Sequence, residues 1–259
     1  MLKVFSIFIF LFFIIWISLV EPNIITVEKL NFNSNDIKNL KIVFVSDFHL
    51  NKFSENRLNR IVDKINEQNP DIVISGGDYA ILHNVKLSLD MSKVAKILSK
   101  IKTKYGFYTV LGNHDYNKDS SDIKEAFKKY NLNVLENSNV EILHNEEPFF
   151  LAGISDMQTT FYSLDKALKN TKPPVILVSH SPDITPDAKD KVDLILSGHT
   201  HGGQVRVPFY GAIIVPSKYG KKYQVGFVDN LVYINRGLGT SILPVRFNCL
   251  PEITVIQYN

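Results

Sequence analysis

The sequence predicts an α/β protein: a mixed central sandwich of strands with helices outside it, a β-rich C-terminal third, and one hydrophobic helix in front. Two patterns carry this prediction. Short runs of β-branched and other apolar residues recur along the chain, and stretches with helical periodicity lie between several of them. Runs of four to six such residues, bounded by turn signals, are typical of strands buried on both faces. The N-terminal stretch is longer, uncharged and different in kind.

That N-terminal stretch covers residues 4–20, seventeen residues without a charge. This length is at the low end of what spans a bilayer and is long for the apolar region of a signal peptide, and no small-x-small cleavage pattern follows it. We therefore expect residues 1–22 to be an uncleaved membrane anchor, with a cleaved signal or a buried core helix as alternatives. Lysines lie on both flanks, so the charge pattern only leans towards an outer domain and leaves its side of the membrane open.

Residues 23–40 are polar and rich in asparagine, and we expect a linker that enters a first strand near residues 24–30. One folded domain is then expected at residues 41–259. Its main strands are expected at 41–46, 72–75, 107–111, 149–154, 175–179 and 194–197. Apolar residues three or four positions apart indicate helices around 58–65, 94–101 and 123–130. Shorter strands are expected at 204–207, 212–215, 231–234 and 253–257.

Composition and charge exclude several classes of protein. The chain is 45% apolar and 21% charged, which is ordinary for a globular domain. Its net charge is only +3 and its lysines are dispersed, unlike the dense basic stripe of a nucleic-acid-binding protein, so no nucleic-acid partner is expected. Cys249 is the only cysteine, which excludes an intramolecular disulfide and a zinc site built on cysteine pairs.

Five of the seven histidines stand at the ends of the expected strands, in motifs of small and polar residues. The motifs are Ser46-Asp47-Phe48-His49, Gly76-Gly77-Asp78, Gly112-Asn113-His114-Asp115, Ser179-His180-Ser181 and Gly198-His199-Thr200-His201. Ligands of open α/β sheets gather at the carboxyl ends of the strands, so five separate loops can bring these side chains to one place. Each motif alone is compatible with a solvated loop or a tight turn, but their shared position at strand ends favours a common site.

Carboxylate, imidazole and amide groups without thiolate are the ligands of a hard or borderline divalent metal. Asp-x-His is expected to put two ligands on one extended loop, because side chains two positions apart point the same way, and His-x-His repeats this from a second loop. The set exceeds the need of one tetrahedral ion, whereas two ions that share a bridging carboxylate would use it. Two ions about 3.5–4 Å apart activate a water and clamp the oxygens of a phosphoryl group.

Several residues outside these motifs carry weaker expectations. His83 and His144 are expected at the surface. Arg236 and Arg246 lie in a Gly-rich and Pro-rich region and are candidates to hold a substrate phosphate, with structural ion pairs as the alternative. Apolar residues around 209–227 are candidates for a lip that receives a lipid chain, although core packing is the favoured interpretation.

The ordered set D-x-H, G-G-D, G-N-H-D, H and G-H-T-H resembles the calcineurin-like metallophosphoesterases over residues 41–201. The resemblance implies a four-layer sandwich of mixed sheets flanked by helices, and a phosphoesterase that acts through a metal-bridging hydroxide. It implies two divalent ions, of Mn, Zn, Fe or Mg. One would be held by Asp47, His49 and His201. The other would be held by Asn113, His180 and His199, with Asp78 bridging the two.

The same resemblance assigns a different role to His114, which matches the family's non-ligand histidine. That residue protonates the leaving group or steadies the transition state, and Asp115 beside it would orient the ring. The Gly-Asn-His-Asp segment is expected to form a tight turn. One departure is Ile81, where relatives often carry a second, supporting Asp.

Further segments are similar to a membrane-associated bacterial branch of the family. They are Gly202-Gly203-Gln204, 235–240, 244–246 and 251–253. This implies hydrolysis of a phosphodiester, phosphomonoester or pyrophosphate bond, with a lipid-linked substrate as one version, by a single-pass protein of a bacterial inner or plasma membrane. One alternative is a UDP-2,3-diacylglucosamine pyrophosphate hydrolase of lipid A synthesis, with its domain on the cytoplasmic side. Another is a non-catalytic metal-binding scaffold. The sequence leaves the substrate and the oligomeric state open.

Overall fold

A computed structural model describes residues 2–34, 37–81, 87–117 and 120–259. Two six-stranded sheets form the centre of the domain. The first contains, in spatial order, β1 (Thr26–Phe32), β14 (Glu252–Tyr258), β2 (Lys41–Val45), β3 (Ile72–Ser75), β4 (Phe107–Thr109) and β5 (Leu132–Val134). The second contains β12 (Gly226–Val228), β13 (Val232–Ile234), β9 (Leu194–Ser197), β8 (Val175–Val178), β7 (Glu147–Gly153) and β6 (Ser138–His144).

Each sheet has a parallel centre, with one antiparallel pair in the first sheet and two in the second. Strands β2 to β5 are parallel, whereas β14 runs antiparallel to β2 and pairs in parallel with β1. In the second sheet β7, β8, β9 and β13 are parallel, while β6 and β12 pair antiparallel with β7 and β13. A separate hairpin pairs β10 (Arg206–Val207) with β11 (Gly211–Ala212).

Alternation of side chains along the strands builds the layers. On β2, Ile42 and Phe44 face the second sheet, where they belong to one core cluster with Leu151 of β7. Val43 and Val45 point the other way into a core shared with the helices. Because successive side chains on a strand point to opposite faces, one apolar run fills both cores.

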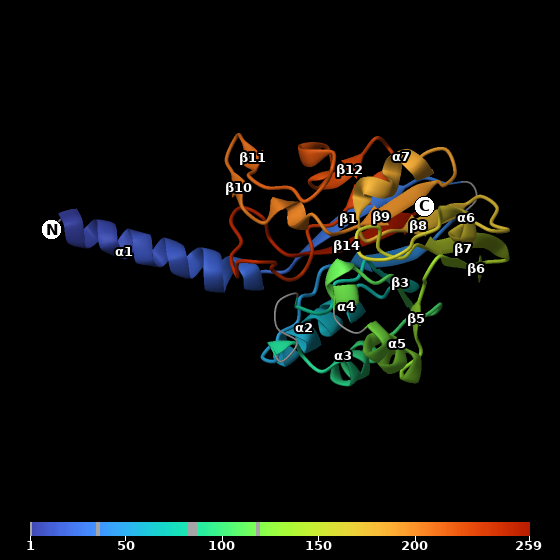
Figure 1. The fold of residues 1–259 in the computed structure, drawn as a ribbon, viewed down its shortest axis with the longest axis horizontal. Helices are drawn as coiled ribbons and strands as arrows, with labels where there is room; N and C mark the ends of the chain where they lie inside the picture. Colours follow the sequence, from blue (N-terminus) through green and yellow to red (C-terminus); the bar gives the residue numbers. More distant parts are fainter. Residues whose placement is uncertain (1, 35–36, 82–86, 118–119) are drawn as a thin grey trace.

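Helices cover the outer faces of both sheets (Figure 1). On the first sheet these are α2 (Glu55–Asn66), α3 (Met91–Leu98) and α5 (Ser120–Lys129), whose buried apolar residues belong to the core cluster under that sheet. On the second sheet α6 (Leu164–Ala167) and α7 (Thr185–Ala188) contribute to a third cluster. The expected four-layer arrangement of mixed sheets and flanking helices is therefore confirmed.

The N-terminal helix α1 (Leu2–Ile15) projects away from the domain (Figure 1). Helical turns continue it through Trp16–Val20 and Glu21–Asn23. The stretch Val4–Asn23 is long and apolar enough to cross a membrane, with a mean hydropathy of 2.6. Its last residues already contact the domain, since Glu21 and Pro22 are buried. The expected first strand is β1, which forms an edge of the first sheet.

Some local expectations differ from the structure. Strands β5, β6 and β12 were not predicted, because β5 and β12 are only three residues long and β6 is largely polar. The expected tight turn at Gly112–Asp115 is instead the start of a short helix, α4 (Asn113–Asn117). His144 is buried rather than exposed, with Nδ1 at 2.9 Å from the Tyr105 hydroxyl and Nε2 at 2.9 Å from the Lys38 carbonyl. His83 lies outside the described residues.

Candidate metal centre

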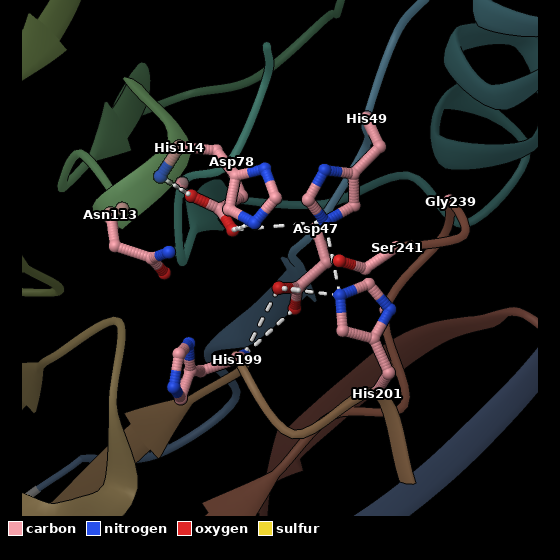
Figure 2. Close-up of polar contacts among 12 residues, drawn as sticks. Asp47, His49, Asp78, Asn113, His114, His199, His201, Gly239 and Ser241 are labelled. Carbon is pink, nitrogen blue, oxygen red and sulfur yellow. Dashed lines mark hydrogen bonds and ion pairs between the residues drawn. The ribbon is translucent and has the colours of Figure 1, made fainter. Parts of the chain in front are cut away.

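The site lies where strands from both sheets end at a common edge. β2, β3 and β4 of the first sheet lead into the Asp47, Asp78 and Asn113 motifs, and β8 and β9 of the second lead into the His180 and His199 motifs. Figure 2 shows Asp78 and Asn113 converging with Asp47 and His199 on one small volume. The motifs come together because each follows a parallel strand, as the sequence pattern predicted.

One group of ligand atoms comes from the Asp47 loop and the end of the His199 loop. His49 Nε2 lies 3.0 Å from His201 Nε2, and His201 Nε2 lies 3.4 Å from Asp47 Oδ1. These atoms lie within 4.8 Å of one another, which suits one ion. All three side chains are buried. This is the set that the resemblance assigned to the first metal.

A second group surrounds His180. Its Nε2 lies 3.1 Å from Asn113 Oδ1, 3.1 Å from His199 Nδ1 and 3.2 Å from Asp78 Oδ2. Asp78 Oδ2 also lies 3.7 Å from His49 Nε2 of the first group. One carboxylate oxygen therefore faces both groups, which is the position a bridging ligand requires.

Five of these side chains stand on backbone in the left-handed region. The φ angles are 53° at Asp47, 44° at His49, 58° at Asp78, 68° at His199 and 53° at His201. Left-handed conformations of non-glycine residues cost about 1–3 kcal/mol each and persist only where the surroundings hold them. The expectation of an extended Asp-x-His loop was thus wrong: the two side chains converge because both residues turn left-handed.

Backbone carbonyls fix the tautomers of two rings. His180 Nδ1 donates to Gly76 O at 2.7 Å, and His49 Nδ1 donates to Ala80 O at 3.2 Å. Their Nε2 lone pairs then point inward, towards other nitrogen and carboxylate atoms. Metal-bound histidines characteristically donate their second N–H to a carbonyl or carboxylate in this way. The donor atoms present therefore fit divalent cations.

Burial keeps most of the imidazoles neutral, which is the form that binds a metal. It lowers the pKa of His49 to about 3 and that of His199 to about 4, and it holds the pKa of His201 well below the usual value. Burial also raises the pKa of Asp47 to about 6. Desolvation of the charged form is the largest cause in each case.

The pKa values of Asp78 and His180, at the centre of the site, shift in the direction that favours their charged forms. Burial is the largest single cause and opposes charge on both Asp78 and His180, but their mutual attraction and that of other charged neighbours together outweigh it. The pKa of His180 rises to about 10, and that of Asp78 falls below its usual range. An ionised carboxylate at the centre is therefore the stable state, and a cation that binds there would displace the proton from His180.

His114 reaches the same volume from α4. Its Nε2 lies 4.0 Å from Asp78 Oδ2, and its ring packs edge-on against His49 with centroids 4.5 Å apart. Its backbone N–H donates to Asp78 Oδ1 at 2.9 Å. The ring therefore faces the ligands from the Asn113 side, as Figure 2 shows.

Asp115 does not orient the His114 ring, so that expectation is corrected. Its carboxylate accepts from the backbone N–H groups of Asp78 and Tyr79, both at 2.8 Å, and from those of Ala80 and Gly112, both at 3.1 Å. The helical path of α4 turns this side chain into the neighbouring loop. Asp115 thus fastens the Asp78 loop to the start of α4.

The two arginine candidates make structural contacts instead of facing the site. Arg246 is fully buried, and its guanidinium donates to the carbonyls of Gly239, Gly237, Arg236 and Cys249. Arg236 pairs with Glu252 and Glu28. The phosphate-holding expectation is wrong for Arg246, and for Arg236 the ion-pair alternative is the one the structure supports.

One loop at the site escaped the sequence reasoning. Asp156 follows β7, is buried, and accepts through Oδ2 from the backbone of Gln158 and Thr159. Its Oδ1 is buried without a hydrogen-bond partner among the described residues. The Gln158 amide nitrogen lies 2.9 Å from His199 Nε2. The sequence did contain an indication of this loop, because Ser155-Asp156 follows an apolar run as the other motifs do.

Comparison with known proteins agrees with this geometry. Residues 40–203 match the family described as calcineurin-like phosphoesterase. A Bacillus subtilis (strain 168) protein named uncharacterized metallophosphoesterase YkuE is 34% identical over 91% of this chain and 86% of its own. Phosphodiesterase YaeI of Escherichia coli (strain K12) is 32% identical over 89% of this chain and 86% of its own. A Danio rerio protein named transmembrane protein with metallophosphoesterase domain is 31% identical over 90% of this chain and 55% of its own.

Gly198 provides a test of how tightly the site is built. A Cβ there would lie 2.0 Å from Ser46 Oγ and 2.3 Å from Asp47 Oδ2, so Gly198→Ala must displace Asp47. We expect metal affinity to fall roughly 10–100-fold, the size of effect seen when ligand positioning is disturbed. Metal titration of the purified protein measures this.

The matched control is Gly220→Ala, where a Cβ meets nothing within 4 Å although φ is +54°. It carries a backbone cost of about 1–2 kcal/mol but leaves the ligands in place, so its metal affinity should be normal. Unchanged affinity in Gly198→Ala would contradict the close packing at Asp47.

Proposed function

The chain belongs to the calcineurin-like phosphoesterase family and is a metal-dependent phosphoester hydrolase; from this premise we propose that it hydrolyses a phosphodiester bond with two divalent ions, and that Asp78 bridges them. The observation that carries the proposal is the place of Asp78 Oδ2, 3.2 Å from His180 Nε2 and 3.7 Å from His49 Nε2. The phosphodiester is favoured because a relative that is 32% identical is named a phosphodiesterase.

The proposed ligands divide into two groups around that carboxylate. Asp47, His49 and His201 hold one ion, and Asn113, His180 and His199 hold the other. Two such ions supply an activated water and neutralise charge on the phosphoryl oxygens. The metal identity stays open, because imidazole, carboxylate and amide ligands suit Mn, Zn, Fe and, less well, Mg.

The chain's own residues orient these groups and handle the proton. Carbonyls of Gly76 and Ala80 hold the rings of His180 and His49 with Nε2 facing inward. His114 lies close enough to His49 and Asp78 to share an ion with them, but we assign it to neither ligand set. In this proposal it carries a proton at Nε2 to the leaving oxygen. Asp115 acts only as a positioning residue, through the loop of Asp78.

We further propose that the N-terminal helix anchors the enzyme in a membrane and that the substrate is lipid-linked. Val4–Asn23 has the length and composition to cross a bilayer. The folded domain is proposed to begin at Glu21, because Glu21 Oε1 accepts from the backbone N–H of Cys249 at 2.7 Å. The scaffold alternative is disfavoured, since every proposed ligand position carries a side chain able to bind a metal.

Removing the shared carboxylate tests the proposal. Asp78→Ala should lose at least one ion per chain, because both groups depend on that oxygen, and turnover of bis-p-nitrophenyl phosphate should fall by roughly 10²–10³-fold or more. Elemental analysis and initial rates measure the two effects.

A suitable control is Asp187→Ala, which removes an exposed carboxylate on α7. It should keep both ions and normal turnover. Near-normal metal content and turnover in Asp78→Ala would show that the ligand assignment is wrong.

His114→Ala separates catalysis from metal binding. A general acid contributes roughly 10²–10⁴-fold, and a poor leaving group needs it most. The variant should keep both ions, lose much of its rate on an alkyl phosphodiester, and lose less on a nitrophenyl phosphodiester.

His144→Ala is the control, since it removes a buried histidine near the start of β7, at the opposite end of the sheet from the ligand loops. It should lower thermal stability but leave the ratio of the two rates unchanged. A His114→Ala protein that lost an ion would make His114 a ligand, and equal losses on both substrates would remove the proton-donor role.

A further inference from the structure

Six large apolar side chains are exposed on two neighbouring segments of the C-terminal third. We call this set the apolar rim: Phe209, Tyr210, Ile213, Ile214, Ile242 and Leu243. Phe209 and Tyr210 lie at the tip of the β10–β11 hairpin, and Phe209 is fully exposed. Core packing was the favoured interpretation of the apolar residues around 209–227. It holds for Tyr223, which is buried, and is wrong for the exposed Phe209, Tyr210, Ile213 and Ile214.

Hydrogen bonds join the two segments of the rim into one unit. The Gln204 side chain donates to the carbonyl of Leu243 at 2.9 Å and accepts from the backbone N–H of Ser241 at 2.8 Å. The backbone N–H of Arg206 donates to Phe247 O at 2.9 Å. The hairpin and the 241–247 loop are therefore held against one another.

The N-terminal helix ends on this same unit. The backbone N–H of Arg246 donates to Ile17 O at 2.8 Å, and the Phe13 ring packs edge-on against Phe247 with centroids 5.4 Å apart. Figure 1 shows the β10–β11 hairpin on the side of the domain from which α1 projects. A membrane crossed by α1 would thus lie next to the rim.

The charge around the rim favours an anionic surface. Residues 198–228 contain Arg206, Lys218, Lys221 and Lys222 and no acidic residue. All three lysines are exposed, and Lys222 pairs with Asp229 just beyond this range. Lys221 Nζ lies 3.3 Å from the centroid of the Tyr210 ring. Aromatic and aliphatic side chains beside lysines are typical of surfaces that enter the headgroup region of a bilayer.

The rim also adjoins the metal centre along the chain and in space. His201 precedes Gly202-Gly203-Gln204, and the Cys249 thiol donates to His201 O at 3.3 Å. The backbone N–H of Gly239 donates to Asp47 O. The segments that support two proposed ligands therefore continue directly into the rim.

From these contacts we propose that the apolar rim enters the headgroup region of the anionic bilayer that α1 crosses, and holds the metal centre beside that layer. The enzyme then takes its phosphodiester from a lipid in the membrane instead of from solution. The second statement rests on the proposed function. The first rests on the contacts of the rim and on the membrane anchor proposed above, and not on the proposed reaction.

A fluorescence experiment on the full chain tests the membrane contact. Leu243 and Leu143 are exposed to the same degree, 62% and 61%, but Leu143 lies on β6, outside the rim. Leu243→Cys and Leu143→Cys proteins are each labelled with bimane and inserted in vesicles of phosphatidylcholine and phosphatidylglycerol, with and without brominated acyl chains. Cys249 is buried, and the unmutated chain measures any labelling there.

Bromine should quench the label at 243 and leave the label at 143 unaffected. Quenching at 243 should weaken in vesicles without phosphatidylglycerol, because the basic residues then lose their partner. Equal quenching at the two positions, or none at either, would overturn the membrane contact.

The consequence for catalysis is tested with the triple variant Phe209→Ser, Ile242→Ser and Leu243→Ser. It should hydrolyse bis-p-nitrophenyl phosphate normally but lose roughly tenfold or more on a phosphodiester presented in vesicles, because the apolar contact is lost. Equal effects on both substrates would overturn the role in substrate access. If the unmutated enzyme cleaved neither diester, the proposed function would fail, while the quenching comparison would still decide the membrane contact.

Discussion

The geometry of the site depends on one buried carboxylate, that of Asp115, which ties two of its loops together. Asp115 accepts four backbone N–H groups, three from the Asp78 loop and one from Gly112. Burial and the charge of Asp78 raise its pKa to about 7, so these N–H groups are what favour its ionised form. Hydrogen bonds to a charged group contribute about 1.5–3 kcal/mol each. By joining β3's loop to α4, Asp115 fixes the distance between the shared carboxylate of Asp78 and the ring of His114.

The backbone conformation of the ligand residues follows from the close packing at the strand ends. Five ligand-bearing residues adopt left-handed backbone, a strain that the packed sheets on both sides must hold. Glycines precede two of them, Asp78 and His199. A side chain at Gly198, or at Gly112 before Asn113, would collide with a proposed ligand. The ends of packed strands therefore position the proposed ligands, and fixed positions are what a preorganised electrostatic site requires.

The positions of the buried strands and the order of the ligand motifs could be predicted from the sequence, because both follow from residue periodicity and spacing. Buried parallel strands such as β3 and β9 were predicted with their observed bounds, and the convergence of the Asp47, Asp78 and His199 loops followed from their place at strand ends. Side-chain direction was harder. Because a helix and not a turn follows Gly112, the Asp115 side chain points to the Asp78 loop and not to the His114 ring. Arg246 is buried, and its guanidinium donates to backbone carbonyls and not to a substrate site. Nor does composition distinguish an exposed apolar rim from a core, since both use the same residues.

Together these features describe a catalytic domain whose proposed ligand loops, N-terminal apolar helix and apolar rim share one end of the molecule. The central claim is that two ions share Asp78. Crystals grown with Mn²⁺ and measured at the manganese absorption edge test it most directly. The account predicts two anomalous peaks about 3.5–4 Å apart with an Asp78 oxygen between them. One peak, or two peaks that Asp78 does not join, would contradict it.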